Sequence, residues 1–144
     1  MVTALRHLGF DYVFDTDFAA DLTIMEEGTE LLGRLKKHLE GDENVQLPIL
    51  TSCCPGWVNF FEYNYPELKD VPSTARSPQQ MFGAIAKTYF ADKIKVDRKD
   101  LVVISIMPCL AKKYECQRDE FAVDGNPDVD YSISTRELAH LIKQ

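Results

Sequence analysis

The chain has no apolar run near the roughly 20 residues that cross a bilayer, and its first residues lack the apolar core of a signal peptide. It has no internal repeat or low-complexity tract. Acidic residues outnumber basic ones by 23 to 16. The resulting net charge of −7 argues against nucleic acid or an anionic membrane as partner. The four cysteines do not follow the spacing of a small disulfide-bonded domain, which indicates a reducing compartment. We therefore expect a cytoplasmic protein.

Helical and strand patterns alternate along the 144 residues, which suffice for a single domain, 1–144. Helices are expected up to Gly9, from an N-cap at Asp17 to Gly41, from Pro55 to Pro66, from a capping box at 77–80 to about Asp92, after Cys109 to about Arg118, and from a second capping box at 134–137. Strands are expected at 10–14, 47–50, 101–106 and 129–133. The pattern predicts an α/β fold with a mainly parallel sheet of about four strands, flanked by helices.

Two cysteine-bearing turns each follow a predicted strand. Residues 51–57 (TSCCPGW) come after the apolar run 47–50, and residues 107–112 (MPCLAK) come after the run 101–106. Ligands collect beyond the carboxyl ends of parallel strands, and the first residues of a helix favour a thiolate. A disulfide between the adjacent Cys53 and Cys54 would need a strained ring. The sequence therefore predicts a metal or redox site at this edge of the sheet.

The two turns resemble the first two signatures of the iron-only ([FeFe]) hydrogenase catalytic domain, TSCCPxW and MPCxxKxxE. The second match covers residues 107–115, and the resemblance extends from about residue 9 to residue 138. The third signature of that family, with two more cysteine ligands, is absent. The resemblance implies one lobe from the middle of a catalytic domain that interconverts H2 with protons and electrons. We expect the isolated chain to be inactive.

The resemblance implies that Cys54 and Cys109 are two of the four ligands of a [4Fe–4S] cluster. In the full-length protein this cluster and a diiron subcluster form the H-cluster. The other two ligands would lie beyond residue 144, so we expect no cofactor to be stably bound by this fragment. Cys53 is not a ligand in the family; its thiol exchanges a proton with the diiron cofactor. Cys116 is spare, and we expect a small buried residue there.

The resemblance also implies a proton path through Glu27, Glu30, Arg34 and Ser73. Glu27 would be the inner relay and Glu30 the outer one, with the Ser73 hydroxyl between them. From spacing alone, the three residues on the predicted helix form a solvated stripe with one Glu30–Arg34 ion pair, worth about 0.3–0.5 kcal/mol. Ser73 alone would be an ordinary turn serine.

Five further residues are implied to line the cofactor pocket. Lys112 would hydrogen-bond an anionic cyanide ligand, with Glu115 anchoring it or a neighbouring segment. Met107 would line the pocket, and Pro78 and Gln79 would lie beside the diatomic ligands. Without the family frame, Lys112 is a solvated lysine and residues 77–80 are a helix cap.

The implied partners are the rest of the catalytic domain and, for electrons, ferredoxin or accessory iron–sulfur clusters. H2 and protons would be the substrates. A hydrogenase-like protein of iron–sulfur assembly is an alternative, against which Cys53, Lys112 and Glu115 argue. A sensory hydrogenase-like subunit and a non-enzymatic binding module remain open as well.

Overall fold

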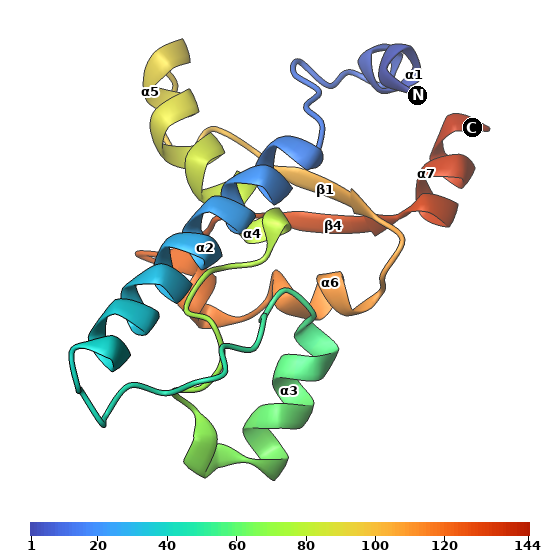
Figure 1. The fold of residues 1–144 in the computed structure, drawn as a ribbon. Helices are drawn as coiled ribbons and strands as arrows, with labels where there is room; N and C mark the ends of the chain where they lie inside the picture. The colour runs from blue at the N-terminus through green and yellow to red at the C-terminus, as the bar shows by residue number, and fades with distance from the viewer.

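A two-stranded parallel sheet lies at the centre of the computed structural model, which describes residues 1–144 (Figure 1). Its strands are β1 (Ile104–Met107) and β4 (Tyr131–Ser134), paired from Ile104 with Tyr131 to Met107 with Ser134. This pairing confirms the α/β class with parallel strands. The number of strands was overestimated, because the parallel sheet has two rather than about four.

Two of the predicted strands do not form. Residues 47–50 contribute only one isolated parallel bridge, from Leu50 to Pro72. Proline lacks the N–H that a ladder needs, so Pro48 and Pro72 both limit the pairing. Residues 10–14 form no strand either. Their aromatic side chains contact other rings instead; the ring centroids of Tyr12 and Phe90, for example, are 4.9 Å apart.

The helices largely follow the sequence pattern. Those helices are α1 (Val2–His7), α2 (Asp17–Leu39), α3 (Pro55–Asn64), α4 (Pro78–Ile85), α5 (Ala91–Ile94), α6 (Ala111–Glu115) and α7 (Thr135–Ile142). A π-helical turn, η2 (Ala86–Phe90), joins α4 to α5, so the predicted helix is continuous but irregular. Two short 3₁₀ turns, η1 (Pro66–Leu68) and η3 (Asp119–Phe121), complete the set. None of the helices combines the length and apolar character that crossing a membrane requires.

The helix caps correct three details. The N-cap of α2 is Thr16 rather than Asp17, which is the first helical residue. At α4, Ser77 accepts a hydrogen bond from the Gln80 N–H, but no reciprocal bond from the Gln80 side chain is present. Only the capping box at Ser134 is complete. Helix α6 ends at Glu115, short of the predicted Arg118.

A small antiparallel hairpin turns at Asp124 and Gly125. Strands β2 (Ala122–Val123) and β3 (Asn126–Pro127) pair across Asp124 and Gly125, whose φ angles are +51° and +76°. Glycine adopts this left-handed backbone without steric cost, which explains why the hairpin can turn here.

Buried ion pairs fasten the segment after the hairpin to the helices. Asp128 is 2% exposed and pairs with both Arg76 and Arg98. Lys87 in η2 is equally buried and binds Asp130 at 2.8 Å. Because a buried charge must be paired to be tolerated, these contacts fix the start of β4 against the helix.

The centre of the core is small. Ala86, Val103 and Val129 form it, and Phe82, Leu101 and Cys116 pack around it. Gly83 lies so close to the chain at 128–129 that a Cβ there would come within 2.6 Å of Val129 Cγ2. α4 can therefore pack tightly against residues 128–129, just before β4, only because this position has no side chain.

Candidate functional site

Three free thiols lie at the two cysteine turns. Cys53 precedes α3, Cys54 is its N-cap, and Cys109 lies in the turn between β1 and α6. All three are exposed. Pro55 occupies the first helical position as predicted, where its missing N–H costs nothing.

Lys112 connects the two cysteine turns. Its Nζ donates a hydrogen bond of 2.7 Å to the Cys53 carbonyl oxygen, 59 residues away. The same ammonium binds the Glu115 carboxylate, at 3.0 Å to Oε2 and 3.2 Å to Oε1. Helices α3 and α6 also pack against each other. The fold therefore brings both motifs of the sequence to one place.

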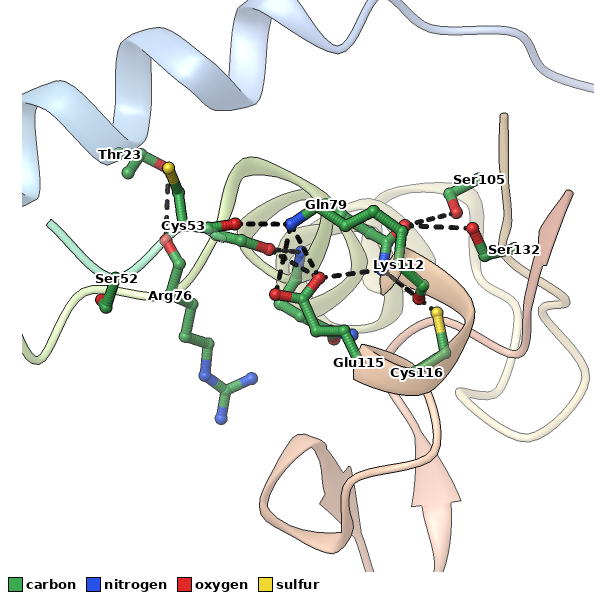
Figure 2. Close-up of polar contacts among 12 residues, drawn as sticks. Thr23, Ser52, Cys53, Arg76, Gln79, Ser105, Lys112, Glu115, Cys116 and Ser132 are labelled. Atoms are coloured by element: carbon green, nitrogen blue, oxygen red, sulfur yellow. Dashed lines mark hydrogen bonds and ion pairs between the residues drawn. The ribbon is translucent and has the colours of Figure 1, made fainter. Parts of the chain in front are cut away.

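Glu115 is the anchor of this lysine. It is 3% exposed, and its Oε2 also accepts hydrogen bonds from Ser77 Oγ at 2.9 Å and Gln79 Nε2 at 3.0 Å. Figure 2 shows Lys112 and Gln79 converging on this carboxylate. A buried carboxylate with this many donors holds the lysine in a fixed position.

Gln79 uses both ends of its carboxamide within the protein. Nε2 lies 3.2 Å from the Lys112 carbonyl oxygen and 3.1 Å from Cys116 Sγ. Oε1 accepts from Ser105 Oγ at 2.6 Å and from Ser132 Oγ at 3.4 Å (Figure 2). Gln79 thus ties α4 to α6 and to both strands of the parallel sheet. Gln79 is only 2% exposed, which the sequence pattern does not indicate.

The other predicted pocket residues lie around this network. Pro78 is the first residue of α4, directly beside Gln79. Met107 ends β1 and lines an apolar cavity of about 750 Å³ between that strand, the α4 region and residues 1–16. Cys116 is half-buried against the core, and burial, reinforced by the Glu115 charge, raises the pKa of its thiol to about 11.

Glu30, Ser73 and Arg34 form a second cluster. Ser73 Oγ donates to Glu30 Oε2 at 2.8 Å, and the Thr74 N–H donates to the same oxygen at 3.0 Å. Arg34 forms an ion pair with the other carboxylate oxygen. Burial raises the pKa of Glu30, but the hydrogen bonds from Ser73, Arg34 and Thr74 outweigh it and leave that pKa below its ordinary value. The stripe is therefore not a solvated face.

Arg34 also has a role that spacing could not suggest. Its Nη1 donates to the carbonyl oxygens of Gln46 at 3.2 Å and Val71 at 3.1 Å, and its Nη2 donates to that of Pro72 at 3.1 Å. One guanidinium thus holds two loops against α2. Backbone carbonyls have no sequence signature, so only the folded chain reveals these contacts.

Glu27 is less well connected. Its Oε1 is buried and has no hydrogen-bond partner. No direct hydrogen bond joins it to Ser73 or to Cys53, so the structure brings together the outer part of the predicted path but not its inner part. Buried polar atoms are normally paired with protein or ordered water.

Four serines contribute to the site beyond what the sequence pattern indicates. Ser77 was expected only as a cap, whereas Ser52, Ser105 and Ser132 were not singled out. The last two are hydroxyls within the strands β1 and β4, and a polar residue within a predicted apolar strand was the available signal. Ser52 Oγ bonds to the loop that carries Ser73.

The family model described as "Iron only hydrogenase large subunit, C-terminal domain" matches residues 1–144. The chain therefore belongs to the iron-only hydrogenase family. No three His, Cys, Asp or Glu side chains gather as a metal site within this chain.

Individual relatives agree with this assignment. The chain is 73% identical over 144 residues to the NADP-reducing hydrogenase subunit HndD of Solidesulfovibrio fructosivorans and spans 25% of its length. It superimposes on a solved variant of the [FeFe]-hydrogenase HydA1 from Chlamydomonas reinhardtii with a TM-score of 0.93 and 49% identity, covering 99% of this chain and 35% of that one. More distant relatives include the cytosolic Fe-S cluster assembly factor NAR1 of Scheffersomyces stipitis, 34% identical over 142 residues, or 97% of this chain and 25% of that one.

Proposed function

We propose that this chain supplies one part of an [FeFe]-hydrogenase catalytic site, which interconverts H2 with protons and electrons. The observation that carries the proposal is the hydrogen bond from Lys112 Nζ to the Cys53 carbonyl oxygen. It places the turn of Cys53 and Cys54 beside the turn of Cys109. The same turns match the family's signatures.

The donor chemistry fits an iron–sulfur cluster in part. Cys54 and Cys109 would provide two thiolates, and a [4Fe–4S] cluster usually needs four. The other two would have to come from outside these 144 residues. When bound, the H-cluster supplies the redox chemistry of hydrogen at its diiron unit.

The chain's own residues would hold and move protons. Cys53 Sγ would take up and release the proton at the cofactor. The Ser73 hydroxyl donates to Glu30 and accepts from the Ala75 N–H at 3.1 Å, which leaves it one lone pair for a donor on the inner side. A hydroxyl that accepts on one side and donates on the other can relay a proton. Glu27 would be that inner donor, and Arg34 would hold Glu30 and its loop.

The pocket residues would orient the cofactor. The Lys112 ammonium, fixed by Glu115, would face an anionic ligand of the metal. Met107, Pro78 and Gln79 would exclude water and restrict movement around the diatomic ligands. Ferredoxin or accessory clusters would deliver the electrons, in a cytoplasmic setting.

A hybrid protein provides the test. The 144 residues would replace the matching segment of the Solidesulfovibrio fructosivorans subunit, which is 73% identical. We expect the hybrid, once loaded with its clusters, to produce H2 from a reduced viologen dye. Loss of a general acid–base group costs about 10²–10⁴-fold, so Cys53→Ala should reduce the rate by at least about 100-fold. The 144-residue chain alone, treated identically, should produce no H2.

Controls separate this loss from misfolding. Thr88→Ala removes an exposed hydroxyl that bonds only to the Ala84 carbonyl oxygen and should leave the rate unchanged. A hybrid whose rate survives Cys53→Ala would contradict the proposal.

The second candidate is a role in iron–sulfur assembly, which the similarity to NAR1 supports. It predicts that the hybrid binds iron and sulfide but produces no H2 with any loading procedure. Iron and acid-labile sulfide analysis beside the H2 measurement distinguishes the two.

A further inference from the structure

Ser52 joins the two loops that carry the proposed proton path. Its Oγ lies 3.0 Å from the Ser73 carbonyl oxygen and 2.9 Å from the Ala75 carbonyl oxygen. These partners are 21 and 23 residues away in the chain. A hydroxyl has one hydrogen, so the two carbonyls share it. Figure 2 shows Ser52 on the segment that leads into Cys53.

The backbone of the preceding residues supports the same contact. The Ser73 N–H donates to the Leu50 carbonyl oxygen at 2.7 Å, and Leu50 and Pro72 form an isolated parallel bridge. Ser52 extends this short pairing by one side-chain contact. Without it, the last hydrogen bond between the two segments would be the one from the Ser73 N–H to the Leu50 carbonyl oxygen.

The opposite side of the same loop is held by α2. Glu30 accepts from Ser73 Oγ and from the Thr74 N–H, and Arg34 donates to the Pro72 carbonyl oxygen. The loop therefore lies between two anchors, α2 and the cysteine turn. The side-chain anchor on the cysteine side is Ser52.

We propose that Ser52 is a positioning residue that sets the separation between the Cys53 thiol and the Ser73 hydroxyl. This inference rests on the proposed function, in which those two groups belong to one proton path with Glu27 between them. Ser52 and Cys53 are neighbours in the chain, with Cα atoms about 3.8 Å apart. A tether at Ser52 therefore restricts Cys53 directly. Proton transfer needs heavy atoms about 2.6–3.2 Å apart or bridged by one water, and a displacement of about 1 Å can cost 10²-fold.

The variants Ser52→Thr and Ser52→Val test the hydroxyl at nearly constant shape, with Ser52→Ala beside them. Ser134→Ala is a matched control, because it removes a serine hydroxyl that caps α7 and makes no hydrogen bond to residues 73–75. All are made in the hybrid protein. The first readout, on protein without cofactor, is hydrogen–deuterium exchange of the amides of residues 73–75 by mass spectrometry.

We expect exchange at residues 73–75 to accelerate about tenfold in Ser52→Val and Ser52→Ala, and to stay unchanged in Ser52→Thr and Ser134→Ala. In the loaded protein, H2 production should fall at least about tenfold in the first pair. The solvent deuterium isotope effect should rise, because proton transfer becomes more rate-limiting, while KM for the electron donor should stay constant. A residue with a merely structural role would alter the melting temperature without altering the isotope effect.

Equal exchange and equal H2 production in Ser52→Val and Ser52→Thr would overturn the inference. So would a loss of rate with an unchanged isotope effect. Failure of the proposed function is recognised separately. In that case the hybrid produces no H2, or Cys53→Ala leaves its rate of H2 production unchanged. The exchange measurement still decides in that case whether Ser52 holds the loop.

Discussion

Cys116 differs from the other three cysteines in its surroundings. It packs against the core and accepts a hydrogen bond from Gln79 Nε2, whereas Cys53, Cys54 and Cys109 are exposed. Burial and the nearby Glu115 carboxylate both disfavour its thiolate. The sequence-based expectation of a small buried residue at this position is thus met in part, since the thiol is half-buried and bonded.

The raised pKa of Cys116 leads to a prediction about pH. Because its pKa is about 11 in the folded chain against an ordinary 9.0, the thiol contributes stability that is complete below pH 9 and is lost as the pH rises through 11. Urea unfolding of the 144-residue chain at several pH values measures this, and Cys116→Ala should flatten the curve between those limits. Iodoacetamide at pH 8 should label the three exposed thiols first. Equal labelling rates for all four would contradict the assignment.

Glu30 and Arg34 show how far residue spacing can be taken. The ion pair between them was expected from their separation by four positions, and it is present. Spacing alone predicts a solvated pair, but the two side chains are only 17% and 15% exposed. The neighbours that cover them, the loops at Gln46 and at 71–74, come from elsewhere in the chain.

At the level of elements, α4 depends on the absence of one side chain. Gly83 faces Val129 and the backbone of Asp128 with no room for a Cβ. The neighbouring strand β4 begins only two residues after Val129. A glycine within a helix otherwise costs stability relative to alanine, so tight packing explains its presence here.

We expect Gly83→Ala to lower the free energy of unfolding by about 1–3 kcal/mol, because the new methyl group overpacks the contact. Gly28→Ala is the matched control, since a Cβ at that position in α2 would meet nothing within 4 Å. That change should raise the free energy by about 0.5–1 kcal/mol through helix propensity alone. Urea denaturation followed by circular dichroism compares the two variants. Stabilisation by both substitutions would show that α4 can move away from the chain at 128–129.

The buried face of α2 differs from the face that its apolar periodicity indicates. The apolar residues that recur at helical spacing along α2 include Phe18, Met25 and Leu32, which are 56%, 68% and 69% exposed. The buried residues of this helix are Ala19 and Thr23. Periodicity therefore predicted a helix correctly but did not predict which face packs on this chain.

Over the whole molecule, exposed apolar surface is unusually extensive. The accessible surface is 9855 Å², whereas a folded monomer of this mass is expected to expose about 7,500 Å². Only 19 of 144 residues are buried. The parallel sheet has two strands, and the apolar cavity beside β1 remains open. Contiguous apolar surface of this kind favours association.

We therefore expect the 144-residue chain to bind an apolar fluorescent dye and to self-associate as its concentration rises. The hybrid protein, in which the parent's remaining residues can cover these surfaces, should bind less dye per mole of chain. Sedimentation velocity over a range of concentrations measures the association. A monomer at all concentrations, with no dye fluorescence, would show that the surface is compatible with water as it stands.

The sequence by itself determined the helices, two of the strands, the complete cap at Ser134 and the two cysteine turns. These depend on residues close together in the chain, so local patterns are sufficient to predict them. The motif resemblance to iron-only hydrogenases also required no coordinates, and the comparisons confirm that family.

Only the tertiary structure decided which contacts assemble the site. The hydrogen bonds from Lys112 to the Cys53 carbonyl oxygen, from Arg34 to three loop carbonyls and from Ser52 to the Ser73 loop all end on backbone oxygens. Every residue carries such an oxygen, so no pattern of side chains can indicate which one is used. Folding selects the acceptors by bringing distant segments within hydrogen-bonding distance.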